Sequence, residues 1–296
     1  MLKFSSAIAS KADADAICAF LAEHEMVNWT VEYDVDGDAH SLCGYFKNKA
    51  RGQDDFSRIV EAFGNIGAVK ISHVETDDWM KVYRKSAKPW QCEDLCWVPT
   101  FMKEEFKAPE NSVCVYVEPG MAFGSGAHIS TQLCGRALVM FKGLYEKTGD
   151  LVIKNCIDVG CGSGILGISA LKFGFVHATF IDIDEDAIRI TQENAQENGI
   201  FPDQMDIAIG DFKIELLGRQ TDLLMANILA DALVKNAHLL VNSIKSGGLL
   251  CLGGILRSES AAVMGVFGRI VRDKWESFLE NSIDDGEWST LVYFRA

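Results

Sequence analysis

The chain has 296 residues, of which 48% are hydrophobic and 24% are charged, a composition typical of globular proteins that excludes disordered and collagen-like chains. This length predicts about two domains. The 28 basic and 42 acidic residues give a formal charge of −14, which argues against direct binding to nucleic acid and favours a basic protein partner.

The first 75 residues mix helical and strand patterns within a short stretch of chain. Helices are predicted over 13–24 and 54–63, and strands over 29–35, 41–46 and 68–74. Such mixing is typical of a small α+β domain, which we place at residues 1–75. Polar residues at 77–88 predict a helical connector, and four of the five prolines follow between positions 89 and 119. We therefore expect a linker segment over residues 76–110.

Residues 111–296 form the second predicted domain, in which strands and helices alternate. The predicted strands are 112–117, 156–159, 178–183, 221–226, 249–252, 275–279 and 288–295. The predicted helices are 131–144, 165–173, 186–198, 233–244 and 261–267. Alternation of this kind predicts an α/β fold with a doubly wound, mostly parallel, Rossmann-like sheet, and the last two strands form a closing pair.

A glycine-rich turn links the strand at 156–159 to the helix at 165–173. Residues 162–167 match the G-x-G-x-x-G pattern of dinucleotide sites, which keeps a nicotinamide-dependent oxidoreductase as an alternative. Asp158 with the glycines at 160–164 also matches the acidic-x-G-x-G-x-G pattern of S-adenosylmethionine sites. The acidic residue would repel a pyrophosphate but suits a methionine group with its sulfonium, so the pattern favours S-adenosylmethionine.

Polar residues lie at the ends of the next two predicted strands and after the apolar stretch between them. Asp182 ends the strand at 178–183, where a carboxylate can bind both ribose hydroxyls. Asp184 is the expected N-cap of the following helix. Asp211 is either a partner for the adenine amino group or an acid in a turn. Asn227 follows the strand at 221–226 and is either a helix cap or a carbonyl acceptor for an incoming amine.

These motifs resemble those of the bacterial methyltransferase family that acts on ribosomal protein L11 of the large subunit. The similar segments are 118–131, 158–168, 181–184, 227–230, 253–256 and Glu287-Trp288. The resemblance covers residues 78–296 and is weak before them. Ser125 and Ser130 replace threonines of the family signature and keep a hydroxyl, Ile129 replaces a common proline, and Glu118 replaces an aspartate.

The resemblance implies an S-adenosylmethionine-dependent protein methyltransferase acting on lysine side chains, or the N-terminal α-amine, of ribosomal protein L11. It makes Phe123, His128 and Asn227 candidate catalytic residues, with residues 123–128 closing over the cofactor. Together with the motifs above, it selects these cofactor-binding candidates: Thr131, Gly160, Gly162, Gly164, Asp182, Asp211 and Asn227. A small-molecule methyltransferase is the alternative, but a metabolite-sized amine needs no separate recognition domain.

Other features bear on location and metal content. No stretch approaches the ~18 apolar residues of a membrane span, and the N-terminal segment lacks the apolar core of a signal peptide. We therefore expect a cytoplasmic protein that does not bind membranes. The nine cysteines lack zinc-ligand spacing, so we expect reduced thiols and no metal site.

Overall fold

The computed structural model shows a chain with two compact units, Met1–Ser86 and Ala87–Ala296. It describes residues 2–24, 26, 28–33, 40–46, 48–64, 66–73, 87–118, 124–148 and 155–296. The connector expected at 77–88 lies almost entirely outside the described residues. Residues 87–110, assigned to a linker from the sequence, lie in the second unit because their strands pair with a strand at 113–117.

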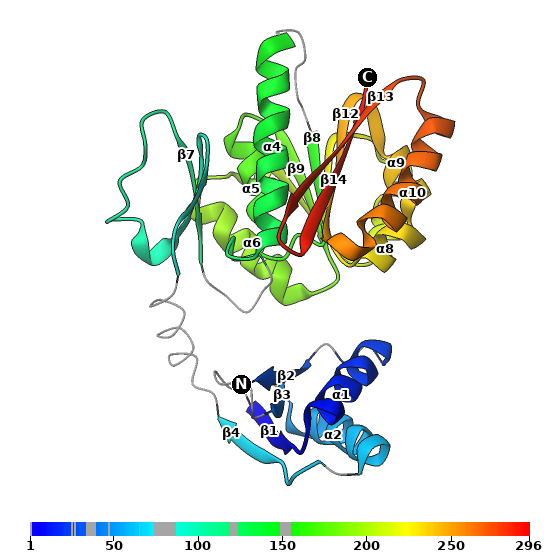
Figure 1. The fold of residues 1–296 in the computed structure, drawn as a ribbon. Helices are drawn as coiled ribbons and strands as arrows, with labels where there is room; N and C mark the ends of the chain where they lie inside the picture. Colours follow the sequence, from blue (N-terminus) through cyan, green and yellow to red (C-terminus); the bar gives the residue numbers. More distant parts are fainter. Residues whose placement is uncertain are drawn as a thin grey trace. The chain divides into compact units, whose positions relative to one another are not determined.

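The first unit is a four-stranded antiparallel sheet in the order β2-β3-β1-β4, with both helices beside it (Figure 1). The elements are β1 (Leu2–Ile8), α1 (Lys11–Glu23), β2 (Trp29–Tyr33), β3 (His40–Phe46), α2 (Lys49–Phe63) and β4 (Lys70–His73). Phe4, Ile17 and Ile59 are fully buried and hold the helices to the sheet. This β-α-β-β-α-β order is that of ferredoxin-like domains.

The second unit contains a seven-stranded sheet in the order β10-β9-β8-β11-β12-β14-β13. Its strands are β8 (Asn155–Val159), β9 (His177–Asp182), β10 (Met205–Ile209), β11 (Thr221–Asn227), β12 (Ile244–Leu256), β13 (Phe278–Asp285) and β14 (Trp288–Arg295). The first five strands in this order are parallel, and β14 is antiparallel to both of its neighbours. The predicted mostly parallel sheet and its closing strand pair are confirmed.

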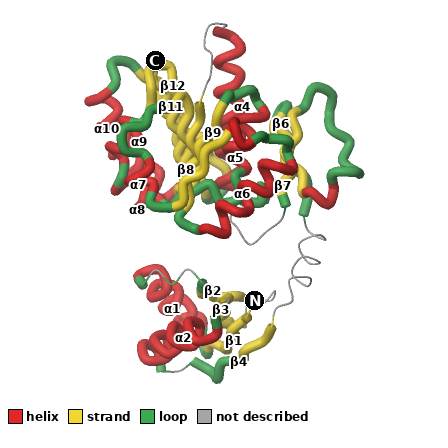
Figure 2. The backbone as a smooth tube through the Cα atoms, turned by 180° about the vertical axis from the view of Figure 1, so that it is seen from behind, coloured by secondary structure: helices red, strands yellow, loops and turns green. Residues whose placement is uncertain are grey.

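Helices cover both faces of this sheet (Figures 1 and 2). They are α4 (Ile129–Thr148), α5 (Ile165–Lys172), α6 (Glu185–Glu197), α7 (Phe212–Glu215), α8 (Ala230–Lys235), α9 (Ala237–Asn242) and α10 (Arg257–Lys274). Successive residues of a strand face opposite sides of the sheet. In β8, Cys156 therefore belongs to the core cluster on the side of α4, α5 and α6, and Ile157 to the cluster on the side of α8, α9 and α10. The helix predicted over 233–244 is two short helices that meet at Asn236. None of the described helices has the length and apolar character to cross a bilayer.

A separate three-stranded sheet precedes the large one in the chain. It comprises β5 (Trp90–Cys92), β6 (Leu95–Pro99) and β7 (Val113–Val117). Trp97 of β6 is 2% exposed, and its indole N–H donates to Ser169 Oγ of α5 at 2.9 Å. A Cβ on Gly135 of α4 would lie only 2.6 Å from the same indole. Trp97 thus fixes the small sheet to α4 and α5.

Candidate active site

The glycine turn between β8 and α5 has a backbone that only glycine adopts readily. Gly160, Gly162 and Gly164 have φ angles of 65°, 56° and 76°, all in the left-handed region. The Gly160 N–H donates to the carbonyl of Ile181 in β9 at 2.8 Å. A Cβ on Gly160 would lie 2.5 Å from the side chain of Ile228. The turn is therefore held close to the ends of β9 and β11.

Asp182 lies at the end of β9, directly beside this turn. Its Oδ2 accepts the Gly162 N–H at 2.9 Å, and its Oδ1 accepts the Asp184 N–H at 3.0 Å. Asp184 is the N-cap of α6, as expected, and accepts the Asp186 N–H at 2.9 Å. The structure thus brings the glycine turn and Asp182 together, as the sequence motif predicts.

Asp158 faces the interior and not the open side of the turn. Its carboxyl is 2% exposed, and Oδ2 accepts the N–H of Gly167 in α5 at 2.9 Å. Burial raises the pKa of this carboxyl to about 7. From the sequence, Asp158 was expected to lie near the methionine group of the cofactor. In the structure its side chain is buried and forms a hydrogen bond that links the first turn of α5 to β8.

Two polar residues of α6 support the glycine turn, and sequence reasoning missed both. Thr191 Oγ1 donates to the Gly162 carbonyl at 3.0 Å. Asn194 donates from Nδ2 to the Ser163 carbonyl at 2.9 Å, and its Oδ1 accepts the Glu118 N–H at 3.0 Å. Asn194 therefore links the turn to Glu118, the first residue of the signature segment 118–131.

A periodic pattern could have revealed these residues. Thr191 and Asn194 of α6 and Asn198, the residue at its C-cap, recur at helical spacing, which places them on one side of the helix. All three are buried, and Asn198 accepts the Tyr116 N–H at 2.7 Å and donates to the Tyr116 carbonyl at 2.6 Å. Polar residues on the buried face of an amphipathic helix indicate backbone groups that need hydrogen-bond partners.

The described part of the signature loop packs on the glycine turn. Ser163 Oγ donates to the Gly124 carbonyl at 2.5 Å. Gly124 and Gly126 have φ angles of 100° and 79°, and a Cβ on Gly126 would lie 3.0 Å from the ring of Trp97. The candidate residue Phe123 lies outside the described residues, so its expected place over the cofactor stays a prediction.

His128 lies at the start of α4, next to the C-terminal strand pair. The Ser130 N–H donates to His128 Nδ1 at 3.2 Å, and the Ser130 hydroxyl lies 2.8 Å from the same nitrogen. The imidazole is edge-to-face with Trp288 of β14, with ring centroids 4.7 Å apart. Burial lowers the pKa of His128.

Asn227 and Thr131 meet although 96 residues separate them in the chain. Asn227 ends β11, and its Nδ2 donates to Thr131 Oγ1 of α4 at 3.2 Å. The carbonyl oxygen of the same amide is buried and has no hydrogen-bond partner among the described residues. A Cβ on Gly253 in β12 would lie 2.8 Å from that oxygen. A buried acceptor without a donor costs about 1–3 kcal/mol, so this oxygen is a position at which a ligand could supply the missing donor.

Asp211 is the N-cap of α7, beside the end of β9. Its Oδ1 accepts the Lys213 N–H at 3.0 Å, and Oδ2 lies 3.2 Å from Lys213 Nζ. The backbone N–H of Lys213, followed by its side chain, lowers the pKa of Asp211. The neighbouring Gly210 N–H donates to the Asp182 carbonyl at 2.9 Å. Asp211 therefore caps a short helix after β10, which fits the alternative of an acid in a turn, and its contact with adenine stays a prediction.

The comparisons with known proteins agree with this geometry. A family model described as "Ribosomal protein L11 methyltransferase (PrmA)" matches residues 6–295. The chain belongs to this family. A relative from Alteromonas mediterranea, named ribosomal protein L11 methyltransferase, is 34% identical over 253 residues, which cover 84% of this chain and 80% of the relative. One of the same name from Escherichia coli is 35% identical over 243 residues, covering 81% and 76%.

A solved structure supports the fold of this family member. The crystal structure of ribosomal protein L11 methylase from Lactobacillus delbrueckii subsp. bulgaricus matches with a TM-score of 0.56 and 23% identity. The match covers 71% of this chain and 99% of that protein. The family resemblance read from the motifs is confirmed, and it extends further than expected, since the family model begins at residue 6 and includes the first unit.

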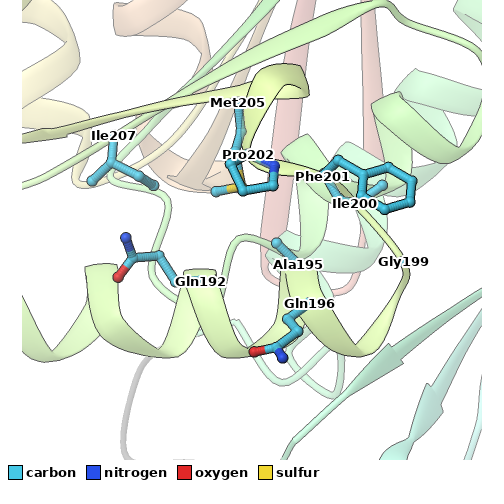
Figure 3. A pocket seen from close by; sticks show the side chains of 9 residues that line it. All are labelled: Gln192, Ala195, Gln196, Gly199, Ile200, Phe201, Pro202, Met205 and Ile207. Carbon is cyan, nitrogen blue, oxygen red and sulfur yellow. The ribbon is translucent and has the colours of Figure 1, made fainter.

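A cavity of about 450 Å³ lies between α6 and β10 (Figure 3). It is bordered by Gln192 and Gln196 of α6, Phe201 of the following turn, and Met205 and Ile207 of β10. None of these is a candidate residue of the methyltransferase site. Among the described residues, no group of three or more histidines, cysteines or acids is arranged to hold a metal ion.

Proposed function

We propose that this chain transfers methyl groups from S-adenosylmethionine to lysine side chains and the N-terminal α-amine of ribosomal protein L11. The observation that carries the proposal is the buried, unpaired carbonyl oxygen of Asn227 at the end of β11, close to the glycine turn. Ligands bind at the carboxyl ends of strands in sheets of this type. The unpaired Asn227 oxygen at the end of β11 could accept a hydrogen bond from the N–H of a substrate amine.

The residues around the glycine turn fit the cofactor. Each oxygen of Asp182 accepts one backbone N–H and retains capacity for one ribose hydroxyl. Ile183 and Ile209, which flank this strand end, are 76% and 53% exposed and offer an apolar surface to adenine, with Asp211 near its amino group. When bound, S-adenosylmethionine supplies a methyl group already activated by a sulfonium.

The acceptor side of the site is proposed to orient a neutral amine. Asn227 Oδ1 would accept an amine N–H, and Thr131 Oγ1 holds the amide in place through its bond to Nδ2. An uncharged amide does not retain the charged product as a carboxylate would. Lysine has a reference pKa of about 10.4, so the amine must be desolvated to lose its proton before it reacts. Orientation and desolvation are then the contributions of the protein.

We propose that the first unit, residues 1–86, recognises the protein substrate. A chain with a charge of −14 attracts a basic partner, as ribosomal proteins generally are, and speeds encounter at low salt. The expected place of action is the cytoplasm, where ribosomes assemble. The proposed function requires neither direct contact with nucleic acid nor binding to a membrane.

The test compares ribosomal protein L11 by mass spectrometry from cells with and without this gene. Additional methyl groups on L11 only in cells that carry the gene are the expected result. Purified full-length chain with labelled S-adenosylmethionine should label unmethylated L11 in vitro. Identical L11 masses in both strains, together with label on a small amine or another protein, would refute the substrate and leave the methyltransferase fold intact.

A further inference from the structure

Two leucines occupy helix N-cap positions at the edge of the sheet where the candidate site lies. Leu229 is the N-cap of α8, two residues after β11, and Leu256 ends β12 and is the N-cap of α10. Leucine has no side-chain acceptor for the first N–H groups of a helix and is among the residues least suited to this position. Leu229 is 77% exposed and Leu256 is 38% exposed. Core packing therefore does not account for Leu229 either.

A closed ring of contacts connects these leucines to Asn227. Asn227 ends β11, which pairs with β12, and Leu256 of β12 lies opposite Trp288 of β14. The ring of Trp288 contacts that of His128, with centroids 4.7 Å apart. α4 starts at the next residue, and its Thr131 accepts the Asn227 amide N–H at 3.2 Å. The leucines therefore lie around the residue that is proposed to bind the amine.

The strand order separates this ring from the proposed cofactor contacts. Gly162 and Asp182 meet at the ends of β8 and β9, on one side of β11 in the sheet. Leu256 and Trp288 belong to β12 and β14, on the other side of β11. A methyl donor on the first side and an amine on the second would meet at Asn227. The side of β12 and β14 is therefore the side from which the amine approaches.

Four exposed or partly exposed apolar residues on this side form what we call the apolar rim. Ile129, the first residue of α4, is 37% exposed, and Trp288 is partly exposed. Leu229 and Leu256 complete the rim. Its members come from four segments of the chain and lie at the carboxyl edge of the sheet, where ligands bind in folds of this type.

Three exposed acids adjoin the apolar rim. Asp231 lies in the first turn of α8, and Glu259 Oε2 accepts the Leu256 N–H at 3.1 Å. Glu287 directly precedes β14, and its carbonyl accepts the Arg257 N–H at 2.8 Å. Arg257 offsets only one of the three negative charges. A surface that is both apolar and acidic suits a partner segment with apolar and basic side chains.

We propose that the apolar rim and its three acids bind the lysine-bearing segment of the basic protein substrate and present its amine to Asn227. The inference rests on the proposed methylation of a protein amine. A protein cannot bring an amine to Asn227 without covering the surface around it, and the ring of contacts makes the rim that surface. The acids attract the basic segment, and the apolar side chains lose water on contact with it. The rim thus determines KM for the protein substrate.

Leu229→Ser tests the rim without endangering the fold, because serine is a favoured N-cap and Leu229 buries little. The variant should unfold at the same temperature as the original chain or higher. With unmethylated L11, we expect KM to rise about tenfold, equivalent to ~1.4 kcal/mol, with kcat and the Kd for S-adenosylmethionine unchanged. Leu229→Met keeps an apolar side chain and should keep the original KM. Leu217→Ser is the matched control, since Leu217 is 69% exposed and precedes the amino end of β11, at the opposite edge of the sheet.

A second pair of variants tests the acids. In Asp231→Asn combined with Glu287→Gln, we expect kcat/KM for L11 to fall about 3- to 10-fold at low salt and the difference to vanish at high salt, because salt screens exposed charges. Glu276→Gln should change nothing, since Glu276 is an exposed acid that precedes β13 at the opposite edge of the sheet.

Several results would overturn the proposal. One is an unchanged KM in Leu229→Ser, or an equal rise in Leu217→Ser. Another is a matching loss of affinity for S-adenosylmethionine, which would assign the rim to the cofactor site. If Leu229→Ser instead converts a dimer to a monomer in analytical ultracentrifugation at unchanged KM, the rim binds a second copy of the chain. An original chain that does not label L11 refutes the proposed function and the rim with it, whereas labelling by the original chain with an unchanged KM in Leu229→Ser refutes the rim alone.

Discussion

Replacing Asp182 with alanine tests the proposed cofactor site most directly. Its carboxylate accepts the N–H groups of Gly162 and Asp184 at 2.9 and 3.0 Å, which leaves one acceptor position on each oxygen for a ribose hydroxyl. Because Asp182 is partly exposed, we take the lower end of the range for charge-assisted bonds, ~1.5 kcal/mol each. Loss of both gives ~3 kcal/mol, or about a 150-fold weaker Kd for S-adenosylmethionine.

Isothermal titration calorimetry with S-adenosylmethionine measures this change. Asp182→Asn, which keeps one oxygen and loses the charge, should fall between the original chain and Asp182→Ala. Asp184→Ala is the control, because it removes the cap of α6 and costs ~1 kcal/mol of stability without touching the proposed ribose position. An unchanged Kd for a folded Asp182→Ala, or an equal loss for Asp184→Ala, would refute the reasoning.

Three further predictions follow from other contacts. Asn194→Ala removes the bonds to Ser163 and Glu118, so thermal denaturation should show a loss of ~2–3 kcal/mol, about 5–10 °C in Tm. The folded pKa of Asp158 is about 7 against ~3.9 unfolded, so the folded state binds the extra proton. The free energy of unfolding of the protein, measured by urea denaturation, should therefore fall by up to ~4 kcal/mol as pH rises from 4 to 7. Asp158→Asn should remove this contribution to the pH dependence. A fragment of residues 87–296 should bind S-adenosylmethionine normally in calorimetry yet fail to label L11; retained labelling would contradict a recognition role for residues 1–86.

The sequence predicted most readily the features that depend on neighbouring residues. The glycine turn and Asp182 belong to one strand–turn–helix–strand unit, so their spacing is a local property and was read correctly. The meeting of Thr131 with Asn227 joins α4 to β11 across 96 residues, and only the family resemblance linked them. Asn194 was missed because its partners are backbone groups of distant segments, which a motif does not show.

The missed fold elements have similar causes. The central strand β1 contains two serines that obscure its alternation, and Ser6 can be buried because its hydroxyl donates to the Gly67 carbonyl, 61 residues away, at 2.5 Å. The helix predicted over 233–244 is interrupted at Asn236, whose side chain donates to the Ala232 carbonyl at 2.8 Å. An asparagine that bonds its own backbone competes with helix continuation, and apolar periodicity alone does not register this.

The anchoring of Trp97 has a consequence for how such proteins diversify. A recombination that joins a foreign N-terminal module between residues 74 and 86 would leave Trp97 bonded to Ser169 and packed against Gly135. A junction at residue 111 would instead remove an indole that buries ~150–250 Å² and open a hole beneath α4 and α5. Module exchange among relatives is therefore expected to carry residues 87–118 with the catalytic half, so that new protein targets can be acquired without disturbing the methyl-transfer site.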